Sequence, residues 1–221
     1  MANSYTSASL VEAELRATTV FSSSTVPSLA SVTTWIDEES AQIDRDIGYS
    51  IAATQRTDIV DYDGSIDPVI YLQVAPVVTA DTISYNTARL GSDDYSTSWV
   101  VKTEDTDFTV YTDKGTIEFL PGFSPSDGKK KFKLVYTAGY STTPLVIQRL
   151  ASKRTALRIL NTLIQNNVSD RNDGGSISVG SINIVEPSNY GVGSYTQLKD
   201  DIDAITNDVT KDFGMRRYGN Y

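Results

Sequence analysis

The stretch Lys133-Leu-Val-Tyr-Thr-Ala-Gly-Tyr-Ser-Thr-Thr-Pro144 decides the fold, because it ends a run of β-type sequence and begins a helix. Residues 134–136 are β-branched, aromatic or aliphatic and predict a strand. Gly139 has the backbone freedom to turn out of a sheet. We expect Thr143 to be the N-cap of the helix and Pro144 its first residue, where a missing N–H costs nothing.

The chain before this junction alternates between short β-type runs and turn signals, from residue 50 to residue 140. The clearest hairpin spans Thr109–Glu118, with Asp-Lys-Gly between two β-prone runs. These features predict an antiparallel β module. The expected strands are Ile51–Asp61, Val69–Val74, Asp81–Asn86, Ser98–Thr103, Asp107–Tyr111, Thr116–Leu120 and Lys131–Thr137.

Helical periodicity appears toward both ends of the chain. A short helix is expected over Ser7–Ala17, with Ser9 and Glu12 as a capping box. A second helix opens at Pro27 and stops at Gly48. Its apolar positions recur every three, four or seven residues and its acidic residues are expected to face away from them. The apolar positions are Leu29, Val32, Ile36, Ile43 and Ile47.

The longest helix is expected from Pro144 to about Asn167, followed by two short β runs at 177–179 and 182–185. A final helix begins at Ser194, capped with Gln197, and ends at Gly214. The fold class is therefore predicted as α+β, with a helical bundle from both chain ends and an inserted antiparallel β module. The domains are a helical body at 1–49 and 141–213, a β module at 50–140, and a flexible C-terminal tail at 214–221.

Composition excludes several functions. The 221 residues contain no cysteine and no histidine, which removes disulfides, thiolate catalysis and the commonest general base and transition-metal ligand. The net charge of -9 disfavours sequence-independent binding to nucleic acid phosphates. No segment has the length of a membrane span and no signal peptide precedes the first helix, so we expect a soluble protein that is not secreted.

Carboxylates are the remaining candidates for catalysis or metal binding. Pairs occur at Asp93-Asp94, Asp61/Asp63 and Asp105/Asp107, all in or beside turn signals, where aspartate is expected for local hydrogen bonding. The runs beginning at Asp61 and Asp170 lack the complete spacing of a calcium loop. We therefore expect no catalytic residues, no cofactor and no metal site.

Several fragments carry a family resemblance through their order and spacing. They are Trp35-Ile36 with Ala41-Gln42-Ile43-Asp44 and Ile47-Gly48, Asp61-Tyr-Asp-Gly64, Ile70-Tyr-Leu72, Ala75-Pro-Val77, Gly115-Thr-Ile-Glu-Phe119, Val135-Tyr-Thr-Ala-Gly-Tyr140 and Pro144. Together they resemble the head–tail adaptor proteins of tailed phages and related viruses, which are also called neck, connector or head-completion proteins. The resemblance spans most of the chain.

The resemblance implies a structural virion protein rather than an enzyme. In this family, subunits made in the host cytoplasm form a ring, usually a dodecamer, between capsid and tail. The implied partners are the portal protein, a tail, stopper or tail-completion protein, and other copies of the chain. Genomic DNA would pass through without specific binding during packaging and ejection, and no membrane is involved.

The family's C-terminal segment commonly reaches into the portal, which here corresponds to the end of the chain. The portal-docking residues implied are Phe213, Met215, Arg216, Arg217, Tyr218 and Tyr221. Arginine and tyrosine are favoured anchors at interfaces, although a solubilising end is an equal alternative. An acidic tunnel would keep DNA moving, and the expected acidic residues facing the lumen are Asp200, Asp201 and Asp203; an ordinary solvated helix face is the alternative.

An alternative function of another class stays open. The 13 tyrosines fit a carbohydrate-binding or other β-rich binding module without catalysis. This alternative predicts a monomer that binds glycans through exposed tyrosine or tryptophan side chains in residues 50–140. The adaptor prediction instead requires a ring and no soluble ligand.

Overall fold

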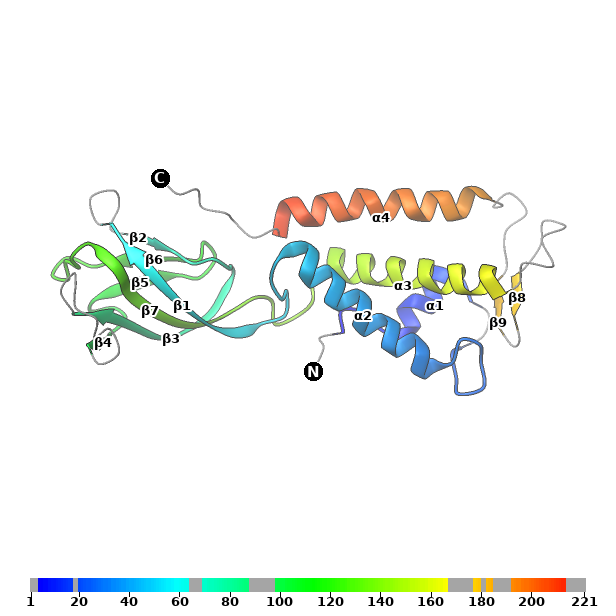
Figure 1. Ribbon diagram of the computed structural model, residues 1–221, viewed down its shortest axis with the longest axis horizontal. Helices are drawn as coiled ribbons and strands as arrows, with labels where there is room; N and C mark the ends of the chain where they lie inside the picture. Colours follow the sequence, from blue (N-terminus) through cyan, green and yellow to red (C-terminus); the bar gives the residue numbers. More distant parts are fainter. Residues whose placement is uncertain are drawn as a thin grey trace. The chain divides into compact units, whose positions relative to one another are not determined.

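The computed structural model describes residues 4–17, 20–63, 69–87, 98–166, 177–179, 182–184 and 192–213. The chain divides into two compact units (Figure 1). The helical unit is formed by Met1–Gly48 and Thr143–Gly214 from the two ends of the chain. The β unit is formed by Tyr49–Thr142 from the middle.

Helix α2 (Leu29–Ile47) shows how the sequence sets the helix bounds. The side chain of Ser28 accepts a hydrogen bond from the N–H of Ser31, which satisfies one free donor of the first turn. Gly48 ends the helix at φ 95, and its N–H donates to the carbonyl of Asp44 at 2.8 Å. The predicted stop at Gly48 is therefore confirmed.

The core of the helical unit joins α2 to α1 (Ala8–Leu15) and α3 (Leu145–Asn166). Full burial of each large aliphatic side chain contributes about 1.5–3 kcal/mol. The core residues are Val11, Leu15, Phe21, Val32, Ile36, Ala156, Ile159 and Leu163. Helix α4 (Val192–Phe213) contacts α3 and α2 and buries Ile202 and Val209, which lie outside this cluster.

The segment before α1 is held against α2. The N–H of Tyr5 donates to Ser40 Oγ at 3.0 Å, and the Tyr5 hydroxyl donates to Asp44. Ser4 Oγ donates to Asp37. Asp37, Ser40 and Asp44 follow a spacing of three and four, so they lie along one side of α2. Asp37 and Asp44 therefore bind the segment that precedes α1.

The β unit contains two antiparallel sheets. The four-stranded sheet has the order β1-β7-β3-β4 and the three-stranded sheet the order β2-β6-β5. A separate hairpin, β8 (Ile177–Val179) and β9 (Ile182–Ile184), lies in the chain segment of the helical unit. The other strands are β1 (Thr54–Tyr62), β2 (Val69–Tyr71), β3 (Val77–Asn86), β4 (Trp99–Lys102), β5 (Phe108–Tyr111), β6 (Thr116–Phe119) and β7 (Gly128–Ala138).

Aromatic rings form the core between these sheets. Phe132 of β7 is fully buried and stacks on Phe119 of β6 with ring centroids 4.9 Å apart. Tyr62, Tyr85 and Phe123 surround Phe132 at 5.4–6.4 Å between centroids. Edge-on and offset ring pairs of this kind add stabilisation beyond the area they bury. One buried side chain thus contacts four other rings from both sheets.

Gly139 is required where β7 leaves its sheet. Its φ is 120, and a Cβ placed there would lie 2.8 Å from the carbonyl oxygens of Ile51 and Ala52. Its N–H donates to the carbonyl of Pro76 at 2.9 Å. No residue with a side chain fits this position without moving the backbone of residues 51–52. The prediction of a glycine turn between strand and helix is confirmed.

The α+β class, with helices from both chain ends and antiparallel strands between them, is confirmed. The hairpin predicted over Thr109–Glu118 is also present, as β5 paired with β6. The predicted tail at 214–221 lies outside the described residues.

Four details at helix starts are wrong. Helix α2 begins at Leu29, with Ser28 as its N-cap, and not at Pro27. Helix α1 begins at Ala8 after Ser7, and Glu12 accepts from the N–H of Phe21 at 2.7 Å instead of closing a capping box with Ser9. Helix α3 begins at Leu145, and its N-cap is Pro144 instead of the predicted Thr143. The carbonyl of Pro144 accepts the hydrogen bond from the N–H of Gln148 that an N-cap residue accepts. Helix α4 begins at Val192, before the predicted cap at Ser194.

Candidate functional site on the helical unit

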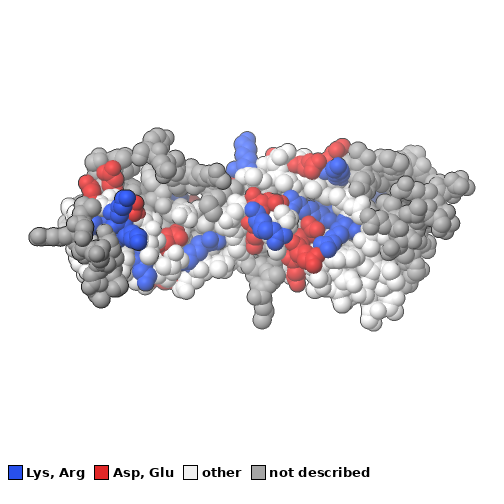
Figure 2. Space-filling model, viewed as in Figure 1, with Lys and Arg blue, Asp and Glu red and all other residues white. Residues whose placement is uncertain are grey.

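Helix α3 carries basic side chains and no acidic ones, whereas α2 and α4 are mainly acidic. Three of these side chains, Lys153, Arg154 and Arg158, are called the basic row below. The basic row contacts acidic or hydroxyl groups from each of the other three helices. Figure 2 shows the result on one face of the helical unit, where acidic and basic side chains alternate instead of forming patches of one sign.

Lys153 links α1 to α4. Its Nζ lies 3.5 Å from Glu14 Oε2 of α1 and 3.2 Å from Asp201 Oδ2 of α4. The lysine side chain is 18% exposed and that of Asp201 is 49% exposed. Pairs this open to water contribute about 0.2–1 kcal/mol each. Lys153 thus connects α1 and α4 through one basic side chain of α3.

Arg154 links α2 to α4. Its Nη1 lies 2.7 Å from Asp46 Oδ2 of α2, and its Nη2 donates to Thr206 Oγ1 of α4 at 3.1 Å. The arginine side chain is 14% exposed, the least of the basic row. The rigid fork of the guanidinium suits two acceptors on two different elements. Arg154 is thus the central polar contact among α2, α3 and α4.

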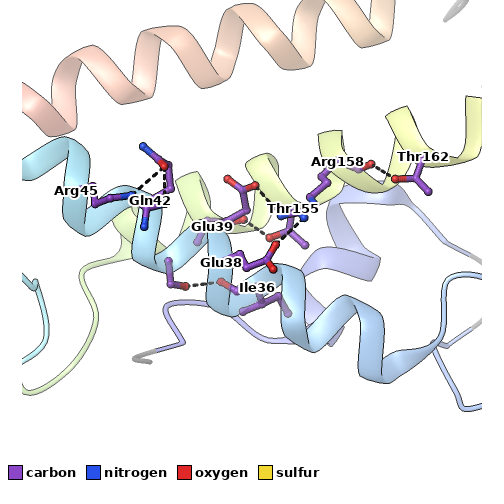
Figure 3. Close-up of polar contacts among 10 residues, drawn as sticks. Ile36, Glu38, Glu39, Gln42, Arg45, Thr155, Arg158 and Thr162 are labelled. Carbon is purple, nitrogen blue, oxygen red and sulfur yellow. Dashed lines mark hydrogen bonds and ion pairs between the residues drawn. The ribbon is translucent and has the colours of Figure 1, made fainter. Parts of the chain in front are cut away.

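Arg158 binds two neighbouring carboxylates of α2. Figure 3 shows Glu38 and Glu39 turned toward it, with its Nη2 2.6 Å from Glu38 Oε2 and its Nη1 3.5 Å from Glu39 Oε1. The guanidinium carbon also lies 5.4 Å from the centre of the Trp35 ring, a distance that permits a cation–π interaction. This part of the basic row holds α2 and α3 in register.

The predicted lumen-facing aspartates lie on α4 and are all exposed. They do not share one direction, because successive helical residues are rotated by about 100°, which places Asp201 and Asp203 on opposite flanks. Asp201 faces α3, where it pairs with Lys153. Asp200 and Asp203 lie on sides of α4 different from the one that carries Asp201.

Of the predicted portal-docking residues, the described part of the chain contains Phe213 alone. It is the last residue of α4 and is half-buried. Met215, Arg216, Arg217, Tyr218 and Tyr221 lie outside the described residues.

Two of the candidate carboxylates bind backbone N–H groups. Asp61 of β1 accepts from the N–H of Lys130 of β7 at 2.8 Å, and Asp107 accepts from the N–H of Thr103 at 2.9 Å. That backbone bond, together with Lys102, holds the pKa of Asp107 below its usual value. Among the residues that the structure describes, no group of three acidic side chains is placed to hold a metal ion. Asp93 and Asp94 lie outside those residues.

Within the described residues, none of the helices combines the length and the hydrophobicity that a membrane-spanning segment needs.

Sequence reasoning located the basic side chains of α3 off its apolar face but missed their partners. The available signal was the contrast in charge between α3 and the two helices with which it packs. That contrast does not identify pairs, since each acidic residue of α2 could reach several cations. The pairing depends on how the helices are rotated about their axes. The packing of the core sets that rotation, and sequence patterns do not show it.

No protein-family model matches the chain, and no curated protein matches it. One similar structure is from the neck of a native GTA particle with C12 symmetry: it has 14% identity, covers 100% of this chain and 98% of that chain, and has a TM-score of 0.49. Another is from the neck of an empty GTA particle with C6 symmetry: it has 14% identity, covers 86% and 87% of the two chains, and has a TM-score of 0.45.

Proposed function

We propose that the chain is a structural subunit of the neck of a virion or virion-like particle. In this proposal, copies of the chain form a ring between the head and the tail, and no reaction is catalysed. The observation that carries the proposal is the agreement between the family resemblance, which spans most of the sequence, and the division of the chain. Both ends contribute to one helical unit, and the middle forms a separate β unit.

The contacts of the basic row support a role as a fixed spacer. Lys153, Arg154 and Arg158 form ion pairs with acidic side chains of neighbouring helices in the same subunit. They are therefore poorly placed to hold nucleic acid phosphates, and the net charge of -9 adds a general repulsion. A ring of such subunits suits passage of DNA better than its retention. Asp200 and Asp203, which are exposed on α4, are the better candidates for the lumen, because Asp201 is paired.

Exposed apolar side chains at the start of α2 support contact between copies. Val20, Val26 and Leu29 are 70%, 50% and 41% exposed. The N–H of Leu29 donates to the carbonyl of Ser22 at 2.9 Å, which brings the start of α2 beside the preceding loop. We propose this surface as part of the ring contact, and a dodecamer as the closed ring. Isolated subunits stay monomeric, because a modest contact gains strength when a symmetric template fixes many copies together.

The portal protein and a tail, stopper or tail-completion protein are the proposed partners. The C-terminal segment, with Arg216 and Arg217, is proposed to dock into the portal. Removing Met215–Tyr221 should then abolish binding to heads while the far-UV circular dichroism spectrum of the free protein stays unchanged. Tailless protein that still joins heads to tails would contradict docking through this segment.

Electron microscopy of the particle that contains this chain tests the proposal directly. We expect a ring of this chain between head and tail. A location elsewhere in the particle, or a catalytic activity that depends on its carboxylates, would overturn it.

A further inference from the structure

The four-stranded sheet of the β unit has two edge strands, β1 and β4. Within the described residues, β1 pairs with β7 alone and β4 pairs with β3 alone. Each strand therefore has one row of backbone N–H and C=O groups that no described strand occupies, and such an edge can pair with a strand of another chain. Neither strand contains proline, which would block this pairing.

The directions of the two edge strands fit head-to-tail addition of a second copy. All strand pairs of this sheet are antiparallel, so the direction alternates along the order β1-β7-β3-β4. Because the number of strands is even, β1 and β4 run in opposite directions. When two copies stand side by side in the same orientation, β4 of one copy meets β1 of the next as an antiparallel pair. Repeating one such contact builds a ring or a filament without a twofold axis.

One row of side chains connects the two edges across the outer face of this sheet. Ile59 of β1 pairs with Lys133 of β7, which pairs with Ser84 of β3. Ser84 in turn pairs with Val101 of β4. Ile59 is 54% and Val101 66% exposed, the highest values among the exposed large apolar side chains described in the β unit. A second copy placed along this row therefore brings two exposed apolar side chains into contact.

The same alignment matches the other side chains of the two strands. Two of the facing pairs are apolar and the third joins opposite charges, and such cross-strand pairs stabilise a sheet. The facing pairs are Val100 with Val60, Val101 with Ile59, and Lys102 with Asp58.

The neighbouring registers are less favourable. A shift of two residues is the smallest one that keeps each side chain on its own face of the sheet. In one direction this shift places Lys102 opposite Arg56, and like charges directly across strands are destabilising. In the other direction it places Val101 opposite the carboxylate of Asp61. The sequences of β1 and β4 therefore favour a single alignment.

A single contact of this kind is weak. Strand β4 has four residues. Lys102 and Asp58 also have partners within the chain, since Lys102 Nζ lies 3.3 Å from Asp107 Oδ1 and the Tyr136 hydroxyl donates to Asp58 at 2.6 Å. Their charges thus select the register more than they add strength. A weak contact that repeats in one orientation suits an assembly in which many copies are held together.

We propose that β4 of one copy adds to β1 of the next copy, so that the four-stranded sheets join edge to edge around the ring. Val101 and Ile59 form the apolar contact at this junction, and Lys102 and Asp58 set its register. The inference rests on the proposed assembly of copies into a ring, and it does not depend on where in the particle the ring lies.

Disulfide cross-linking of the full chain tests the junction, because the chain has no cysteine of its own. In the variant Ile59→Cys/Val101→Cys, the two thiols of one copy are separated by three strand spacings, about 14 Å. A disulfide needs Cα atoms about 4.4–6.8 Å apart, so it can form only between copies. Oxidation at millimolar protein concentration should give dimers, trimers and larger species on a non-reducing gel, and dithiothreitol should return them to monomer.

The variant Ile59→Cys/Val100→Cys is the matched control. Val100 is also exposed and is the neighbouring residue of the same strand, but its side chain lies on the other face of the sheet. This control should stay monomeric. The single variants test the direction of pairing: a mixture of Ile59→Cys and Val101→Cys should give heterodimers, and neither variant should dimerise by itself.

The junction is overturned if the Val101→Cys pair cross-links no more than the Val100→Cys pair. It is also overturned if Ile59→Cys alone dimerises as well as the mixture, since β1 would then pair about a twofold axis. These results are distinct from the test of the neck role. A chain located in the neck without this cross-link would reject only the junction, and a cross-linked chain located elsewhere in the particle would reject only the neck role.

Discussion

The two units of this chain are stabilised by different contacts. The helical unit has an aliphatic core, outside which charged side chains of α3 link three other helices. The β unit has a core of stacked rings around Phe132 and a glycine turn that no other residue fits. We therefore expect salt and single-charge substitutions to destabilise mainly the helical unit, and changes in side-chain shape to destabilise mainly the β unit.

The largest effect is expected from Phe132→Ala. Removing a fully buried ring that contacts four others should cost about 3–5 kcal/mol of unfolding free energy through lost contacts and a cavity. Hydrogen exchange with residue-level detection should show lost protection in the β unit and retained protection in α2 and α3.

Tyr111→Phe, at an exposed aromatic position of the same unit, is the control and should leave protection in both units unchanged. Equal loss of protection in both units after Phe132→Ala would show that they unfold as one, and would break the comparison.

Gly139→Ala should have the next largest effect. A positive φ costs a residue with a side chain about 1–3 kcal/mol. At Gly139 the added Cβ also meets two carbonyl oxygens at 2.8 Å. Gly122→Ala provides the matched control, since Gly122 has φ 113 but no atom within 4 Å of the added Cβ. Urea denaturation should give a lower midpoint for Gly139→Ala than for Gly122→Ala. Equal midpoints would mean that residues 51–52 move easily.

Arg154→Met tests the charged contacts of the helical unit. The loss should be about 1 kcal/mol, because the Asp46 and Thr206 contacts are partly exposed to water. A double-mutant cycle with Asp46→Asn measures the coupling energy of the Arg154–Asp46 ion pair. This energy should be smaller in 1 M salt, because the Debye length there is about 3 Å and the charges are screened. Arg149→Met changes an exposed arginine of the same helix and should be nearly neutral. Coupling that is independent of salt would contradict the ionic account.

The smallest effect on stability is expected from Asp107→Asn, and we expect it to disappear at low pH. Its pKa is lowered in the folded chain by the Thr103 N–H and by Lys102, so its stabilising contribution is present above the unfolded pKa of about 3.9. That contribution is lost as the pH falls through the lowered folded value. Urea midpoints of Asp107→Asn should lie below those of the unsubstituted chain at pH 7, and the two should converge near pH 2. A gap that is constant with pH would mean that the aspartate acts through shape alone.

Much of the fold could be predicted from local patterns. The stop of α2 at Gly48, the hairpin of β5 and β6, and the turn at Gly139 each depend on neighbouring residues. Helix starts were predicted less well. The spacing of Ser9 and Glu12 fits a capping box, but Glu12 instead accepts a hydrogen bond from the N–H of Phe21, which lies nine residues further along the chain. Local spacing cannot show that competing contact.

The candidate site could be predicted only in part. The basic residues of α3 were visible as charges off an apolar face, and the acidic residues of α4 were visible as a group. Their relationship was not, because Asp201 finds Lys153 only once α4 has packed on α3. The placing of Tyr71 and Tyr111 depends in the same way on register, since they are 40 residues apart and both pair with Thr116.

Local sequence sets which segments become helices or strands, where turns need glycine, and which chemistries are absent for lack of cysteine and histidine. Those properties follow from backbone sterics, from the spacing of apolar residues and from side-chain identity, all of which act locally. The tertiary structure decided which charges pair and which rings share a face. Such choices depend on how elements rotate and align when they pack, and that is settled by the core as a whole.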